Sequence, residues 1–150
     1  MTQINKCNCQ CGCEAELQKA SSTIKKTMII SWQRLVDDGH TCPRCGSTES
    51  ELDDAVQQLK EKLASLEIDV IFEKKELSLE EFTNNPVASN CILFNGRSLE
   101  DIIGAKIGKS QCCEVCGDEK CRTTEIGSLS LEVIPSVMIV KAGLKMAIDL

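Results

Sequence analysis

The segment richest in chemistry is Thr41–Gly46, where Cys42 and Cys45 lie two residues apart behind an apolar run at Met28–Leu35. Two thiols at this spacing, between a strand and a helix, either pass electrons as a dithiol/disulfide pair or hold a soft metal. In the redox interpretation, Cys42 is the exposed nucleophile and Cys45 the resolving thiol. The positive charge of Arg44 then favours the thiolate at Cys42.

A second group of cysteines follows in a polar stretch that we expect to be a loop, at Cys112, Cys113, Cys116 and Cys121. Both Cys42–Gly46 and Cys113–Gly117 have the Cys-x-x-Cys-Gly form of a zinc knuckle. Two knuckles provide the four thiolates of a structural zinc site, whose ligands would be Cys42, Cys45, Cys113 and Cys116. The alternative is a relay of thiols that moves electrons or a soft metal.

A third group alternates with polar residues near the N-terminus, at Cys7, Cys9, Cys11 and Cys13. Alternate spacing resembles a strand, but the intervening residues give no apolar face to bury. Neighbouring thiolates chelate Cu(I), Zn(II) or Hg(II) well. We therefore expect residues 1–25 to be a flexible tail that binds a soft metal, the alternative being a tail whose thiols have no specific task.

Two further side chains have competing interpretations. His40, the single histidine, is either a base or ligand beside Cys42 or a solvated loop residue. Cys91 begins a predicted strand and is expected to be a small buried hydrophobic residue.

Composition narrows the function classes. The 150 residues include 11 cysteines and carry a net charge of −6, with three Phe, one Trp and no Tyr. An acidic chain with few aromatic residues is a poor nucleic-acid binder. No apolar run reaches the ~18 residues of a membrane span, and residues 1–27 contain no secretory h-region. We expect a cytoplasmic protein, where many cysteines indicate metal binding or catalytic thiols rather than structural disulfides.

Hydrophobic periodicity predicts one domain over residues 26–150, with a cysteine-rich loop at 108–124. The expected elements are a strand at 27–36, a helix at 49–65, a strand at 68–72, a helical turn at 78–82 and a hairpin around Asn95-Gly96. Residues 136–148 are predicted to form a helix, or partly a strand at 137–141. On the helix, one apolar stripe would comprise Val137, Val140, Leu144, Ala147 and Ile148.

The direction of these strands predicts where the cysteines meet. The first strand runs toward Cys42, the third runs antiparallel to it, and the fourth returns toward the same end of the sheet. The loop from Cys112 to Cys121 should then lie on the edge that carries Cys42 and Cys45.

This order of elements resembles the thioredoxin-like superfamily over about residues 27–150. The chain is most similar to an uncharacterised group of thioredoxin-like domains, through the following features: Trp32, Thr41–Cys45, Ser89-Asn90, Asn95-Gly96 and Cys112–Arg122. It is more loosely similar to thioredoxin-like proteins, some of them selenoproteins, associated with organometal handling. The resemblance implies an α/β fold with a four-stranded mixed sheet, a βαβ unit, a hairpin and a C-terminal helix. Ser89-Asn90 stands where thioredoxins have a cis-proline.

The leading hypothesis is a thiol protein that performs dithiol/disulfide exchange or thiolate-mediated soft-metal handling. Cys42 and Cys45 would react, and the Cys112–Cys121 loop would be a second thiol station. The expected partner is a soft metal, an organometal or a redox protein, with no nucleic acid and no membrane. The alternative is a non-enzymatic module that binds Zn²⁺ through the four knuckle cysteines.

Overall fold

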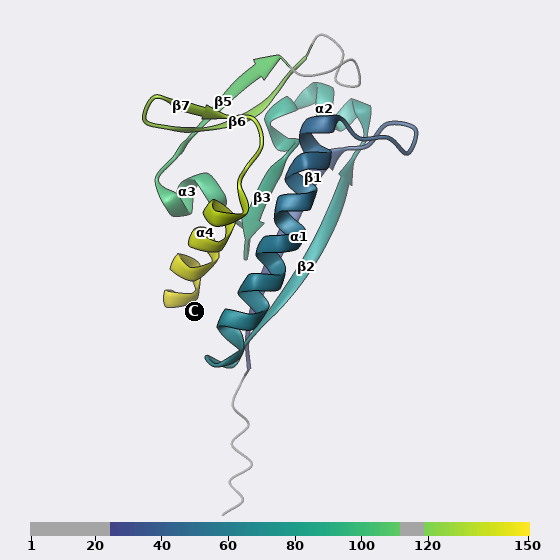
Figure 1. The fold of residues 1–150 in the computed structure, drawn as a ribbon. Coiled ribbons are helices and arrows are strands. Elements are labelled where there is room, and N and C mark those ends of the chain that lie inside the picture. The colour runs from purple at the N-terminus through teal and green to yellow at the C-terminus, as the bar shows by residue number, and fades with distance from the viewer. Residues whose placement is uncertain (1–24, 112–118) are drawn as a thin grey trace, which may run out of the picture.

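The computed structural model describes residues 25–111 and 119–150, which form a mixed α/β structure (Figure 1). Two groups of predicted thiol ligands lie outside the described residues: Cys7, Cys9, Cys11 and Cys13, and Cys112, Cys113 and Cys116. The elements are β1 (Lys26–Leu35), α1 (Pro43–Ala64), β2 (Ile68–Leu77), α2 (Leu79–Asn84), the 3-10 turn η1 (Pro86–Ala88), β3 (Cys91–Phe94), β4 (Arg97–Ser98), α3 (Leu99–Ile103), β5 (Lys106–Gln111), β6 (Lys120–Ile126), β7 (Leu129–Leu131) and α4 (Ser136–Ile148).

The main sheet has four strands in the order β2-β1-β3-β4. β1 is parallel to β2 and antiparallel to β3, and β3 is antiparallel to β4. The predicted four-stranded mixed sheet is therefore confirmed. The hairpin is confirmed as well, because Asn95 and Gly96 have φ values of 48° and 85°, as a two-residue turn between twisted strands requires.

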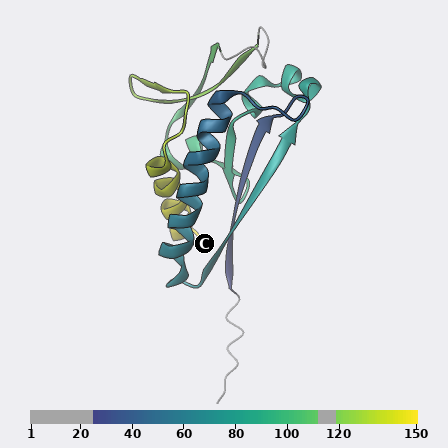
Figure 2. The same cartoon turned by 45° about the vertical axis from the view of Figure 1, so that its right-hand side comes forward.

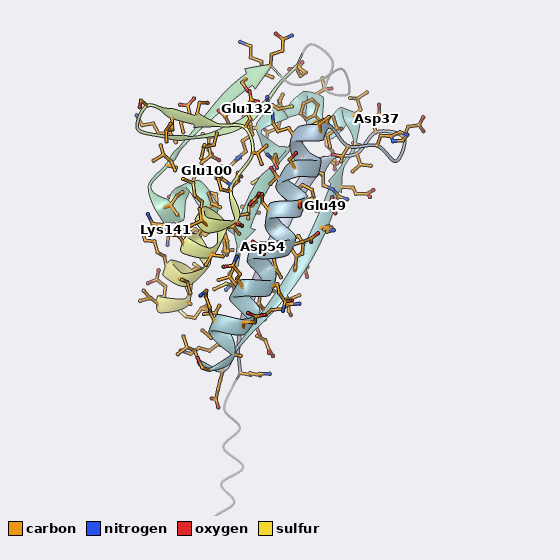
Figure 3. All side chains as sticks on the ribbon, viewed as in Figure 1. Asp37, Glu49, Asp54, Glu100, Glu132 and Lys141 are labelled. Atoms are coloured by element: carbon orange, nitrogen blue, oxygen red, sulfur yellow. The ribbon has the colours of Figure 1, made fainter. Side chains whose placement is uncertain are left out.

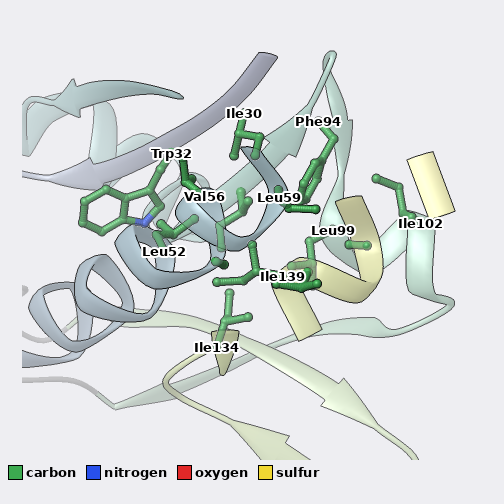
Figure 4. Packing of buried hydrophobic residues seen from close by; sticks show 14 of the residues in the cluster. Ile30, Trp32, Leu52, Val56, Leu59, Phe94, Leu99, Ile102, Ile134 and Ile139 are labelled. Atoms are coloured by element: carbon green, nitrogen blue, oxygen red, sulfur yellow. The ribbon is translucent and has the colours of Figure 1, made fainter. Parts of the chain in front are cut away.

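The core lies between β1 and α1 (Figure 4). Alternate residues of β1, namely Met28, Ile30 and Trp32, are fully buried. They pack against the apolar side of α1, where Leu52 and Leu59 are also fully buried. Burial of each large side chain contributes roughly 1.5–3 kcal/mol, so this layer fixes the position of α1 on the sheet.

α1 begins at Pro43, six residues before the predicted start at residue 49. Thr48–Glu51, which has the sequence of a capping box, lies inside the helix. The earlier start has a local cause, because proline is favoured at the first helical position and its fixed φ suits the helix. Cys42 is consequently the N-cap residue, with extended backbone angles.

Two neighbouring elements follow their predicted signals. The strand predicted at 68–72 is present and longer, ending at Leu77. In α2, the Ser78 side chain accepts from the Glu81 backbone N–H, and the Glu81 carboxylate accepts from the Ser78 N–H. This reciprocal cap fixes where α2 starts.

The chain after the hairpin departs from the expected route. β4 has only two residues and leads directly into α3, so it does not return to the end of the sheet near Cys42. A separate antiparallel sheet, β5-β6-β7, follows instead. The loop expected at 108–124 is therefore shorter, since residues 108–111 belong to β5 and residues 120–124 to β6. Cys121 is a strand residue and is buried.

α4 spans Ser136–Ile148, which confirms the helical alternative. Its predicted apolar stripe is correct only in part. Val140 is buried and Ala147 packs against the core, whereas Val137 and Ile148 are 71% and 83% exposed and Leu144 is exposed as well. α4 instead packs against α1 through the side that contains Ile139 and Gly143, and the two helices lie side by side in Figures 1 and 2. A Cβ on Gly143 would meet Leu59 Cδ1 at 2.6 Å, so glycine permits this close approach. Among the described helices, none has the length and apolar content to cross a membrane.

Candidate functional site

The site is the pair Cys42 and Cys45 at the N-terminal end of α1. Cys42 caps the helix and Cys45 lies in its first turn. Unpaired backbone N–H groups at a helix N-terminus favour negative charge, which suits a thiolate. Both thiols are buried, with exposed fractions of 2% and 1%, so the expectation that Cys42 is exposed is wrong.

The two thiols differ in their tendency to ionise. The pKa of Cys45 lies far above its usual value, first because of the hydrogen bond between its side chain and that of Cys42, and then because burial penalises the thiolate. Cys45 therefore holds its proton in the resting dithiol. The two cysteines are thus placed differently, with Cys42 at the N-cap position and Cys45 in the first turn beside Ser89.

Two hydroxyl groups lie beside Cys45, and the end of β1 orients both. The backbone N–H of Leu35 donates to Ser89 Oγ over 3.0 Å, and Thr41 Oγ1 donates to the Leu35 carbonyl over 3.0 Å. Ser89 Oγ is 3.9 Å from Cys45 Sγ. The hydrogen bonds of Ser89 and Thr41 both lower the pKa of Cys45, which opposes the larger upward effects.

Ser89 is held by the residue that follows it. Asn90 has a φ of 56°, a left-handed conformation that asparagine tolerates better than most residues. Its Oδ1 accepts a hydrogen bond of 3.1 Å from the indole N–H of Trp32, in the buried core. No cis peptide bond occurs in the described part of the chain, so a trans Ser89-Asn90 pair occupies the position facing Cys45.

Arg44, between the two cysteines, connects the site to the second sheet. Its Nη2 donates to the Gln111 carbonyl over 2.9 Å and lies 3.1 Å from the Glu132 carboxylate. Glu132 is labelled in Figure 3, beside the first turns of α1. Gln111 ends β5 and pairs with Lys120 of β6. Both described flanks of the segment 112–118 therefore lie at the edge that carries Cys42 and Cys45, as predicted, although β5 rather than β4 brings them there.

A buried ion pair fixes the second sheet on the core. Arg122 of β6 makes two hydrogen bonds to the Glu100 carboxylate, of 3.0 and 2.7 Å, and both side chains are at least 95% buried. Thr124 Oγ1 donates to Glu100, and Arg122 Nη1 donates to the Val87 carbonyl. Burial raises the pKa of Glu100, but its hydrogen bonds with Arg122 and Thr124 and the charge of Arg122 outweigh that effect and lower it overall.

The other predicted residues have simpler positions. His40 is exposed in a tight turn, where its backbone pairs with that of Asp37, as the solvated-loop interpretation predicts. Cys91 is buried at the start of β3, and burial raises its pKa. Within residues 25–111 and 119–150, no three Cys, His, Asp or Glu side chains are grouped closely enough to hold a metal ion.

Sequence reasoning missed the contacts that matter most around the pair. The sequence marks Ser89-Asn90 as the replacement for the cis-proline of thioredoxins, but it does not indicate a role for the Ser89 hydroxyl. The Glu100–Arg122 pair was not predicted, because a charged residue beside Leu99 and Asp101 resembles an ordinary helix surface. The one sequence feature that indicates this ion pair is Arg122 itself, which directly follows a cysteine in a stretch with few apolar residues.

Comparison with known proteins places the chain in a family. Residues 28–143 match the model of a domain of unknown function, DUF2703. A protein of Archaeoglobus fulgidus, described as an uncharacterized protein, is 46% identical over 112 residues, which cover 75% of this chain and 82% of the relative. No solved structure matches. The match spans the main sheet, the Cys42/Cys45 pair and most of α4, and the chain belongs to the DUF2703 family.

Proposed function

We propose that the chain is a thioredoxin-like thiol protein whose centre, Cys42 and Cys45, cycles between dithiol and disulfide. As a thiolate, Cys42 attacks a disulfide, and Cys45 then displaces the reagent sulfur from the mixed disulfide. With a soft metal ion, the two thiolates would instead bind the ion together, and no disulfide would form. The observation that carries this proposal is the placement of the pair, with Cys42 at the N-cap position of a 22-residue helix and Cys45 in the first turn, 3.9 Å from Ser89 Oγ. The strand, Cys-x-x-Cys, helix and strand order supports it.

The depth of the pair indicates the size of its reactants. Cys42 is 2% exposed as a residue, so its thiol is more accessible to a metal ion, a small organometal or a slender disulfide than to a folded protein. Soft ions are also the species that thiolates prefer. We therefore expect low-molecular-weight reactants.

A structural zinc site is the second candidate, because one contact favours it. Arg44 binds the Gln111 carbonyl at 2.9 Å, so the chain enters residues 112–118 next to the first knuckle. A Cys₄ site would combine Cys42 and Cys45 with Cys113 and Cys116. Such a site would be closed and would have no open coordination position for chemistry.

Timed alkylation separates the two proposals. The full-length protein, purified without oxygen, is treated with iodoacetamide, and each cysteine peptide is quantified by mass spectrometry alongside bound metal. The thiol-centre proposal predicts a metal-free chain in which Cys42 is alkylated before Cys45. Cys91, also buried but outside the pair, is the internal comparator and should react slowly. One tightly held zinc per chain, with Cys42 and Cys45 both protected until a chelator is added, would contradict it.

A further inference from the structure

Resolution of an adduct on Cys42 is difficult in this site because of Cys45. A mixed disulfide at Cys42 is released only when Cys45 loses its proton and attacks the Cys42 sulfur. Cys45 is 1% exposed, and burial raises its pKa. Once Cys42 is bonded to another sulfur, it has no negative charge, and the Cys45 proton no longer has a Cys42 thiolate to stabilise. A separate hydrogen-bond donor is then needed for the Cys45 thiolate.

Ser89 is placed to be that donor. Its Oγ is 3.9 Å from Cys45 Sγ, and the Leu35 backbone N–H donates to the same oxygen over 3.0 Å. A hydroxyl that accepts from a backbone N–H still has its own proton to donate. The Ser89 proton can therefore point to the sulfur without leaving the Leu35 N–H unsatisfied.

Thr41, the other neighbouring hydroxyl, is committed elsewhere. Thr41 Oγ1 donates its proton to the Leu35 carbonyl over 3.0 Å. Leu35 thus orients the two hydroxyls in opposite senses, since its N–H donates to one and its carbonyl accepts from the other. Thr41 would have to break this bond to donate to a thiolate at Cys45, and it lowers the pKa of Cys45 less than Ser89 does, so Ser89 is the stronger donor of the two.

We propose that the Ser89 hydroxyl is a catalytic hydrogen-bond donor, which stabilises the Cys45 thiolate in the step where Cys45 attacks the mixed disulfide on Cys42. The inference rests on the proposed function. In this step the Cys45 proton passes to solvent and a new Cys42–Cys45 bond forms. The bond between Cys42 and the reagent sulfur breaks, and the reagent leaves as a thiolate with the electron pair. Over both steps two protein thiols are oxidised and one small disulfide is reduced to two thiols.

The test uses the reduced full-length chain and 2,2′-dithiodipyridine, a small neutral disulfide. Acid-quenched samples are analysed by peptide mass spectrometry for the Cys42–thiopyridine adduct and for the Cys42–Cys45 disulfide. Ser89→Ala should form the adduct at the wild-type rate and convert it about tenfold more slowly, the loss expected for one hydrogen bond to a charged group. The conversion rate should also reach its midpoint at a higher pH in Ser89→Ala than in wild type, because the Cys45 thiolate of the variant is less stabilised.

Two variants separate this role from a structural one. Ser89→Thr keeps the hydroxyl and should restore the wild-type pH midpoint. Thr48→Val is the matched control, since it removes a buried hydroxyl of α1 that has no hydrogen-bond partner among the described residues. It should leave both steps unchanged. Equal slowing of Ser89→Ala at every pH, or conversion at the wild-type rate, would overturn the role of Ser89.

Different results would overturn the proposed function and the role of Ser89. Absence of the Cys42–Cys45 disulfide in the wild-type chain overturns the proposed function, whereas normal conversion in Ser89→Ala overturns only the inference. If Ser89→Ala does not fold, a crystal structure of full-length Cys42→Ser at alkaline pH replaces it. Ser89 Oγ in hydrogen-bond contact with Cys45 Sγ supports the proposal, and a hydroxyl turned away from the sulfur overturns it.

Discussion

At the scale of single residues, Cys42 and Cys45 have the same side chain and different surroundings. Cys42 caps a helix, whereas Cys45 lies deeper, beside Ser89 and against Cys42 itself. In the proposed function, position on the helix makes Cys42 the first to react and Cys45 the second. The spacing of the two cysteines and the role of Cys42 as nucleophile could be proposed from the sequence. The N-cap position of Cys42 could not, because the apparent capping box at Thr48–Glu51 predicts a later start of α1.

Replacing each cysteine in turn tests this order. Cys45→Ser should accumulate a stable mixed disulfide on Cys42 when treated with dithiodipyridine, because the resolving thiol is absent. Cys42→Ser should form little adduct at Cys45, whose proton is retained by burial. Peptide mass spectrometry measures both, and a faster reaction at Cys45 than at Cys42 would reverse the assignment.

At the scale of elements, the parts that follow local signals were predictable. β1, the hairpin and α4 have apolar patterns or turn residues that act over a few positions. The second sheet was not predictable in this way, because Lys106–Gln111 and Lys120–Ile126 have little apolar alternation. Long-range contacts position that sheet, above all the buried Glu100–Arg122 pair.

Removing the Glu100 charge should therefore destabilise the protein. Glu100→Gln leaves the Arg122 guanidinium buried without its carboxylate, and we expect a loss of about 3–5 kcal/mol in the free energy of unfolding. Urea denaturation followed by circular dichroism measures it. Asp101→Asn is the matched control, because Asp101 lies beside Glu100 in α3 and forms an exposed ion pair with Arg97 of β4. Breaking that pair should cost less than about 1 kcal/mol. Equal losses for both would show that burial of the pair has no energetic consequence.

The same carboxylate predicts how stability depends on pH. The pKa of Glu100 is lower in the folded protein than in the unfolded chain, so the unfolded chain binds its proton first as the pH falls. The contribution of the Glu100 carboxylate to stability is fully present above its unfolded pKa of about 4.3. It is lost as the pH falls through its lower pKa in the folded protein. Urea denaturation from pH 6 to pH 3 should therefore show a shallower acid-induced loss in Glu100→Gln than in wild type. Parallel curves would contradict this origin.

The buried side of α4 differs in part from the predicted stripe, and mutation can check the difference. Ile139 is fully buried and Val137 is 71% exposed, only two residues away. Ile139→Ala should lower the free energy of unfolding by about 2–5 kcal/mol, whereas Val137→Ala should change it by less than about 0.5 kcal/mol. The predicted stripe, which includes Val137 and omits Ile139, requires the opposite result.

At the scale of the whole molecule, the two sheets meet at the N-terminal end of α1. The main sheet contributes Leu35, and the turn between η1 and β3 contributes Ser89. The second sheet contributes Gln111, which Arg44 binds from between the two cysteines. Contacts at this end thus join a thiol pair to the flanks of a cysteine-rich segment. Strand direction in the sequence predicts the same edge, but by a wrong route, since β4 ends at Ser98 and the chain reaches this edge through α3 and β5.

The most direct test of the thiol centre is a redox titration of the full-length chain. The protein is equilibrated without oxygen in mixtures of reduced and oxidised glutathione, quenched in acid and mapped by peptide mass spectrometry. The proposal predicts that Cys42 and Cys45 convert together into one intramolecular disulfide, as a two-electron couple whose equilibrium constant changes tenfold per about 30 mV. A chain that retains one zinc ion per molecule and forms no Cys42–Cys45 disulfide in the most oxidising buffer would contradict it.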